Sequence, residues 1–152
     1  MTPRILVQNR QRKIRVDLPR LRTFAERALH ECRTIPSPRH GKLSRMEEVG
    51  IVLISDQRMA RMHRQYLGVD GPTDVITFQH GEVFISVETA RRQARVFGAS
   101  THREVELYLI HGLLHLHGFD DTTEPAAKEM FAMQKRIVTR LAAGPATRDR
   151  AV

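Results

Sequence analysis

Residues 101–117 limit the possible fold more than any other part of the chain. Large aliphatic side chains in this stretch surround the axis of the expected helix almost completely: Val105, Leu107, Leu109, Ile110, Leu113, Leu114 and Leu116. A helix that is apolar all round has to be buried. The sequence therefore predicts a central helix, covered by other elements on every side, which begins at the capping-box pattern Thr101-x-x-Glu104.

The same helix carries two histidines in this apolar setting. His111 and His115 are four residues apart, so their rings lie about 40° apart around the axis and one turn along it, close enough to bind one ion. A glycine after the helix allows the chain to turn back, so that Asp120 or Asp121 reaches the same ion. Three such ligands with a fourth position for water make up a catalytic zinc site. His117 lies about 200° from His115 and is expected at the surface or in a supporting position.

The spacing of these residues also matches the metzincin protease pattern H-E-x-x-H-x-x-G-x-x-H, with Asp121 at the third ligand position. The glutamate that serves as general base in those proteases falls at Gly112, which has no side chain. A hydrolase of peptides or small molecules is therefore an alternative that the spacing alone favours, and it would lack the usual proton acceptor.

Short β-rich segments come first in the chain and helical patterns come last, which predicts an α+β fold. Strands are expected at 5–7, 13–16, 49–54, 75–78 and 83–85, and helices at 18–32, 56–66, 87–97, 101–117 and 125–141. The expectation is a single compact domain over residues 1–142 with a small mixed β-sheet, about five helices and the histidine helix at the centre. Residues 34–45 are predicted to form a loop, and residues 143–152 a frayed tail.

Positive charge is concentrated at the start of the chain. Residues 1–45 hold 12 Lys/Arg and 3 Asp/Glu, whereas the remainder holds 13 and 14. This distribution favours a localised basic surface that binds a polyanion. With six Phe, two Tyr and no Trp, the composition argues against a broad platform for base stacking and favours contact with the phosphate backbone.

The redox and targeting features point to the cytoplasm. Cys32 is the only cysteine and excludes an internal disulfide. No stretch resembles a signal peptide, and no apolar run approaches the roughly 18 residues of a membrane span. We therefore expect a cytoplasmic protein with no membrane partner.

Four segments together resemble the YbeY-type bacterial endoribonucleases. Residues 111–121, His-Gly-Leu-Leu-His-Leu-His-Gly-Phe-Asp-Asp, are similar to that family's H-G-x-L-H-L-x-G-Y-D-H motif. Residues 71–78 resemble its P-T-D-V-L-S-F segment, residues 81–90 its G-D-I-x-I-S-x-E-T-A segment, and residues 128–131 with Gln134 its closing helix. These matches extend roughly from residue 49 to residue 137, and the first 45 residues add little.

The resemblance implies a single-domain zinc enzyme that cleaves single-stranded RNA in 16S rRNA maturation and ribosome quality control. Its partners would be RNA, in the form of rRNA or the small ribosomal subunit, with a ribosomal protein or GTPase as a further possible partner. The expected cofactor is one Zn²⁺ per chain, held by His111, His115 and Asp121. The family has a histidine where this chain has Asp121, and this carboxylate would make the metal a weaker Lewis acid and admit Mn²⁺ more readily.

A second difference from the family concerns catalysis. The family carries Tyr-Arg-x-x-D before its P-T-D segment, and Leu67 occupies the position of that arginine. Arg64, one helical turn earlier, or Arg61 would have to replace it. The candidate catalytic residues are Arg64 and Asp120, and the candidate RNA-binding residues are Arg12, Lys13, Arg15, Arg61 and Arg64. Leu67 also favours an alternative function, a ribosome-associated RNA-binding factor whose metal is structural.

Overall fold

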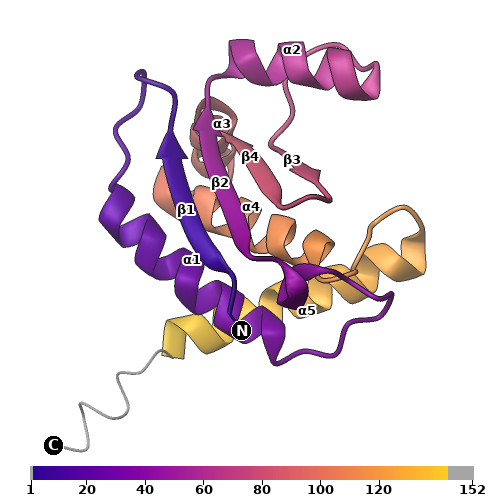
Figure 1. Cartoon of the computed structure of the whole chain (residues 1–152). Helices are drawn as coiled ribbons and strands as arrows, with labels where there is room; N and C mark the ends of the chain where they lie inside the picture. The colour runs from indigo at the N-terminus through magenta and orange to yellow at the C-terminus, as the bar shows by residue number, and fades with distance from the viewer. Residues whose placement is uncertain (1, 144–152) are drawn as a thin grey trace, which may run out of the picture.

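A four-stranded mixed sheet forms one layer of the protein. The computed structural model describes residues 2–143, and Figure 1 shows its strands side by side in the order β1-β2-β4-β3. The strands are β1 (Arg4–Asn9), β2 (Glu48–Ile54), β3 (Val75–Phe78) and β4 (Glu82–Ser86). β1, β2 and β4 are parallel, and β3 pairs antiparallel with β4 in the predicted hairpin. The predicted small mixed sheet is therefore confirmed.

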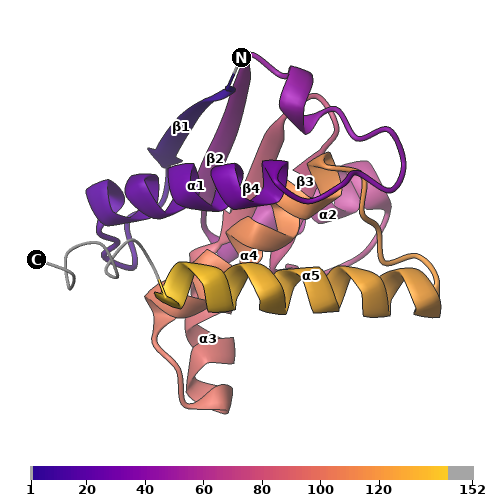
Figure 2. The same cartoon turned by 90° about the horizontal axis from the view of Figure 1, so that it is seen from below.

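Within residues 2–143, five α-helices pack around this sheet, as the sequence predicts. They are α1 (Leu18–Arg33), α2 (Asp56–Leu67), α3 (Val87–Phe97), α4 (Thr101–Leu116) and α5 (Glu124–Ala143), and a short 3₁₀ helix, η1 (Leu43–Arg45), lies within the predicted loop. In Figure 2, α1 and α4 lie against one face of the sheet, and α5 lies beyond them. α4 is thus enclosed between the sheet and α5, which explains why it is apolar on all sides. Among the described residues, no helix combines the length and apolar character needed to cross a membrane.

Gly112 brings the histidine helix into close contact with the sheet. A Cβ atom at this position would lie 2.5 Å from Val83 Cγ1 and 3.2 Å from Thr77 Oγ1. Both distances are shorter than ordinary van der Waals contacts, so any side chain here would push α4 away from β3 and β4. The residue that removes the protease base is therefore required for packing.

A hydrogen-bond network fixes the start of α2 to the start of α3. The Asp56 carboxylate accepts hydrogen bonds from Ser86 Oγ at 2.5 Å and Thr89 Oγ1 at 2.7 Å, and it also pairs with Arg92. In return, Glu88 Oε1 accepts a hydrogen bond from the Asp56 backbone amide at 2.9 Å. Burial works against ionisation of Asp56, yet the hydrogen bonds from Arg92, Ser86 and Thr89 hold its pKa below the usual 3.8. Three polar residues of the segment 81–90, Ser86, Glu88 and Thr89, thus anchor α2.

Two local predictions were wrong. Residues 13–16 do not form a strand but belong to the connection between β1 and α1. There the Gln11 side chain donates to Ile14 O at 2.6 Å and accepts from Ile14 N at 3.0 Å, so a side chain takes the place of a neighbouring strand. The helix α4 is capped by Ser100, whose side chain accepts from Arg103 N at 3.1 Å, rather than by the predicted Thr101 box. The predicted tail, 143–152, lies outside the described residues except for Ala143, which ends α5.

Candidate metal centre

Two histidines and one carboxylate converge where α4 ends. His111 Nε2 and His115 Nε2 are 3.1 Å apart. Asp121 Oδ2 lies 3.5 Å from His111 Nε2, and Asp121 Oδ1 lies 3.8 Å from His115 Nε2. One ligand atom from each residue falls within 4.8 Å of the other two. This cluster can hold a metal ion, and it is composed of the residues that the sequence singles out.

The outer nitrogen of each imidazole faces an oxygen atom. His111 Nδ1 is 3.3 Å from the side-chain Oε1 of Gln134, and His115 Nδ1 is 3.1 Å from the backbone oxygen of Phe119. These oxygens accept hydrogen bonds, so a hydrogen on each Nδ1 suits its partner and leaves each Nε2 as the ring atom that can present a lone pair to the centre. Two lone pairs and a carboxylate that face one another repel unless a cation lies between them. The donor set therefore fits a divalent metal ion.

Burial keeps His115 in the form that binds metal. Desolvation lowers the pKa of His115 below its usual 6.5, and the neighbouring His111 lowers it further. The Asp121 carboxylate and the Phe119 carbonyl act in the opposite direction. The side chains of His111 and His115 are 27% and 21% exposed, whereas that of Asp121 is 48% exposed. The centre thus opens to solvent on its carboxylate side.

The two aspartates at the end of the motif have different partners. Gly118 has a φ of 106°, which lets the chain reverse after α4 as predicted and brings Asp121 back to the histidines. The Asp120 carboxylate instead pairs with Arg39, and its Oδ1 accepts from Thr122 N at 3.2 Å. The structure therefore gathers Asp121 with the histidines and leaves Asp120 beside Arg39.

His117 anchors the loop that precedes β2. It is buried, at 5% exposure, and its Nε2 donates to Ile35 O. The expectation of a surface position for His117 is therefore wrong, and its alternative, a supporting position, stays a prediction. Its ring leaves α4 on the side opposite His115, as the helical angle requires, but this side faces loop 34–42 rather than solvent.

Further contacts hold the same loop against the end of α4. Ser37 Oγ donates to His117 O at 2.7 Å and accepts from Gly41 N at 2.8 Å, and Lys42 N donates to Leu116 O at 3.0 Å. A Cβ atom at Gly41 would lie 2.0 Å from the backbone carbon of His117. The loop thus packs backbone to backbone on the residues that lead into the metal-binding segment.

The candidate RNA-binding residues do not gather at this centre. Arg12, Lys13 and Arg15 follow β1 and so lie at the carboxyl edge of the parallel strands, where Lys13 Nζ is 3.6 Å from Glu88 Oε2. The end of α4 lies near the opposite edge, since Leu116 accepts a hydrogen bond from Lys42, shortly before β2. Arg61 and Arg64 belong to α2, and Arg64 Nε is 3.8 Å from Asp70 Oδ1.

Two contributors to this centre were not identified from the sequence as part of it. Gln134, which orients His111, appeared only as a matching residue of the last helix, and Arg39, which engages Asp120, belonged to the predicted loop. Both act across tertiary contacts, and neither has a spacing that relates it to the histidines. A local pattern could not have indicated either role.

Comparison with known proteins places these features in a family. The sequence model described as Endoribonuclease YbeY matches residues 6–142. This range includes most of the first 45 residues, which the sequence motifs alone did not connect to the family. Endoribonuclease YbeY of Pelotomaculum thermopropionicum is 35% identical over 152 residues, which cover 90% of this chain and 96% of the relative. Its counterpart in Bacillus licheniformis is 36% identical over 112 residues, covering 61% and 71% respectively.

One solved structure also resembles this fold. A solution structure of a Thermotoga maritima protein matches with a TM-score of 0.62 and 26% sequence identity. The match covers 88% of this chain and 86% of that chain. The similarity therefore extends over the sheet and the helices that position the candidate centre.

Proposed function

This chain belongs to the Endoribonuclease YbeY family, and on that premise we propose that it is a zinc-dependent endoribonuclease. Its proposed substrate is single-stranded RNA during 16S rRNA maturation and ribosome quality control, in the cytoplasm. The proposed partners are rRNA within the small ribosomal subunit and a ribosomal protein or GTPase that assists there. The observation that carries the zinc proposal is the convergence of two Nε2 lone pairs and one carboxylate on a single point.

The proposed ligands are His111, His115 and Asp121, with one Zn²⁺ per chain and Mn²⁺ as an alternative ion. When bound, the metal would polarise a phosphoryl oxygen and lower the pKa of a coordinated water. Gln134 and the Phe119 carbonyl keep both imidazoles in the tautomer that presents Nε2. Arg39 neutralises Asp120, so that the second carboxylate adds little net negative charge beside the substrate phosphate.

Cleavage of a phosphodiester also requires a cation for the charge that develops on its oxygens. Leu67, at the family's arginine position, is 59% exposed at the end of α2. Arg64 lies one turn earlier; its side chain is 80% exposed, and its Nε is 3.8 Å from Asp70 Oδ1. We propose that Arg64 supplies this charge, with Arg61 as the second candidate, and that Asp120, which is not a proposed metal ligand, is the catalytic carboxylate.

The exposed Leu67 also favours the second candidate function, an RNA-binding factor with a structural metal. An arginine at this position would serve catalysis, whereas an exposed leucine contributes neither charge nor a core contact. The two functions differ in turnover and agree in RNA binding and metal content. A test must therefore measure metal and cleavage on the same samples.

We would measure zinc content and cleavage of single-stranded RNA for the wild type, Asp121→Ala, Asp120→Asn and Leu67→Arg. We expect about one zinc per chain in the wild type, a large loss in Asp121→Ala and retention in the matched control Asp120→Asn. Absence of metal in the wild type, even after reconstitution, would overturn the hydrolase proposal.

Cleavage separates the two candidate functions. Wild-type cleavage that Arg64→Ala abolishes would support the enzyme and the role of Arg64. Cleavage that appears only in Leu67→Arg would show that the chain is an RNA-binding factor whose active site lacks one charge.

A further inference from the structure

We propose that a hollow between α2 and the β3–β4 hairpin binds one nucleobase of single-stranded RNA, a proposal that rests on the proposed function. This aromatic pocket has a volume of about 520 Å³ and is lined by Tyr66, Phe78, His80 and Phe84 together with Arg58, Arg61 and Gln65. None of the proposed metal ligands lines this pocket. No single one of the family's sequence segments contains all of its residues. Its size and its residues suit a planar aromatic ring with an attached phosphate.

The aromatic rings form a contact chain in which solvent exposure increases from the core to the surface. Phe84 is buried, and its ring centroid is 5.7 Å from that of the half-buried Phe78. Phe78 in turn contacts Tyr66 at 5.1 Å and the His80 ring at 5.8 Å, the latter in a stacked arrangement. Tyr66 remains 57% exposed. An aromatic ring held at its edge by Phe78 and open to solvent provides a surface on which a base can stack.

Polar groups in the pocket match the rest of a nucleotide. Arg58 and Arg61 lie three residues apart on α2, so both reach the same side of the helix and offer positive charge to a phosphate. Gln65, one turn after Arg61, offers an amide donor and acceptor to the edge of a base. The one carboxylate of the pocket, Glu82, is engaged with His80 at 2.6 Å. The charge of the pocket therefore favours an anionic, aromatic ligand.

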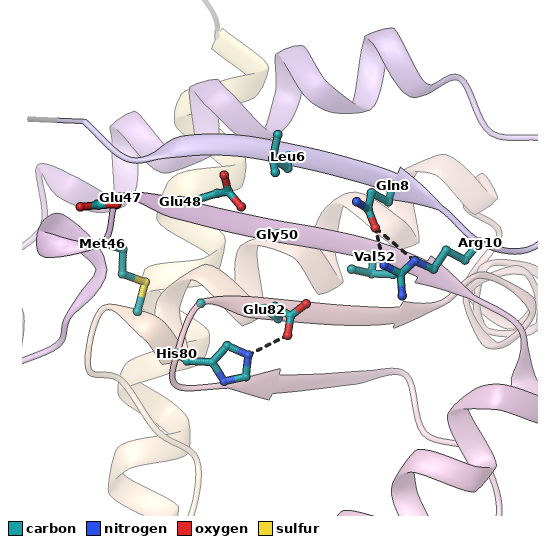
Figure 3. Close-up of a pocket in the computed structure, with 11 residues that line it drawn as sticks. Leu6, Gln8, Arg10, Met46, Glu47, Glu48, Gly50, Val52, His80 and Glu82 are labelled. Carbon is teal, nitrogen blue, oxygen red and sulfur yellow. Dashed lines mark hydrogen bonds and ion pairs between the residues drawn. The ribbon is translucent and has the colours of Figure 1, made fainter.

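The adjoining hollow on the open face of the sheet has the opposite character. It has a volume of about 430 Å³ and shares only His80 and Glu82 with the aromatic pocket. Figure 3 shows that Glu47 and Glu48 also line it, beyond the paired His80 and Glu82. Glu48 pairs with Arg4 and Glu82 with His80, so the remaining Glu47 offsets Arg10 and this hollow offers a phosphate backbone no excess positive charge. RNA is therefore directed to the aromatic pocket.

The pocket and the metal centre lie on opposite sides of one edge strand. β3 is the last strand of the sheet, and its Thr77 faces Gly112 of α4, next to His111. The following residue, Phe78, points to the other side because side chains alternate along a strand, and there it joins the aromatic pocket. A single strand of RNA that crosses this edge can thus insert a base into the pocket while its neighbouring phosphate faces the histidine helix.

The chain provides an intrinsic probe for this proposal. It has two tyrosines and no tryptophan, and the second tyrosine, Tyr108, is buried at 8% exposure. Quenching of tyrosine fluorescence on mixing with single-stranded oligoadenylate would therefore report a base stacked on Tyr66. Stopped-flow mixing reads this signal before cleavage, and anisotropy of a labelled oligoadenylate gives the Kd.

We expect wild-type fluorescence to be quenched and Tyr66→Ala to weaken binding roughly 10-fold. Tyr66→Phe should keep the wild-type Kd and lose the quenching, because the stacking surface remains while the reporting phenol is removed. Phe97→Ala is the matched control, since it removes an aromatic residue that is 72% exposed on α3, and its Kd should not change.

The outcomes separate the two proposals. Wild-type protein that binds oligoadenylate without quenching, and with a Kd that Tyr66→Ala leaves unchanged, would overturn the aromatic pocket alone. Wild-type protein that binds no single-stranded RNA would overturn the proposed function and the pocket with it.

Discussion

Gly41→Ala should weaken both the fold and the metal centre. The added Cβ atom would lie 2.0 Å from the backbone carbon and 2.1 Å from the backbone oxygen of His117. Backbone atoms in a helix end cannot rotate away as a side chain can, so the loop has to move off α4. This movement breaks three hydrogen bonds, which are Ser37 Oγ to His117 O, Gly41 N to Ser37 Oγ, and Lys42 N to Leu116 O.

Three net hydrogen bonds at about 1 kcal/mol each correspond to a loss of about 3 kcal/mol in the free energy of unfolding. For a chain of this size the loss lowers Tm by roughly 6–12 °C. We would measure the loss in stability by thermal and urea unfolding of protein from which a chelator has removed the metal. Zinc affinity would be measured by competition with a chromophoric chelator. Zinc affinity should fall about 10-fold or more, because His117 leads directly into the segment that carries Asp121.

Gly50→Ala is the matched control for this prediction. Its Cβ atom would meet Glu82 Cγ at 3.6 Å, an ordinary van der Waals distance, so we expect little change or slight stabilisation. A Gly41→Ala protein whose Tm stays within about 2 °C of Gly50→Ala would show that the loop does not pack on α4 as described. A lower Tm with unchanged zinc affinity would refute the coupling between the loop and the metal centre.

Three further predictions concern single side chains. Burial lowers the pKa of His115 below 6.5, so the unfolded chain binds more protons at this residue than the folded chain. Protein from which a chelator has removed the metal should therefore lose stability as the pH falls through 6.5. His115→Gln should flatten this pH dependence of the free energy of unfolding, measured in urea. Gln134→Ala removes the partner of His111 Nδ1 and should weaken zinc binding roughly 10–100-fold, whereas Lys135→Ala, at the next exposed position, should not. Burial raises the pKa of the fully buried Cys32 thiol to about 12, so a disulfide reagent should label it only as fast as the protein unfolds; faster labelling of native protein would contradict this burial.

The sequence predicts most of the fold because its patterns are local. Ser55, Gly68 and Gly98 are respectively the cap that begins α2 and the left-handed residues that end α2 and α3, and each acts within a few residues of its place in the chain. The failure at residues 13–16 has a physical reason. A segment shows alternating polar and apolar residues whenever one of its sides packs on the core, whether or not it pairs with a neighbouring strand. Here Ile14 and Val16 pack against the core from a connection that the Gln11 side chain holds by hydrogen bonds.

The candidate centre divides in the same way between local and remote effects. The helical spacing of His111 and His115 is a local property, so it could be predicted from the motif. Which of Asp120 and Asp121 approaches them depends on Arg39, which reaches Asp120 from a loop far away in the chain. The motif spacing of residues 111–121 favours Asp121 as the ligand, but the contact that engages Asp120 elsewhere lies outside that segment.

The aromatic pocket could not be predicted from amino-acid composition. The number of aromatic residues indicates how much stacking surface the chain contains, but not which of these residues lie together in the folded protein. In this protein one of the two tyrosines and two of the six phenylalanines line one pocket, because Tyr66 lies in the last turn of α2 while Phe78 and Phe84 lie on paired strands. A chain too poor in aromatic residues for a broad stacking platform can therefore still form one site for a single base. Such a site suits a nuclease that selects unpaired RNA, since a base inside a duplex has no free face to stack.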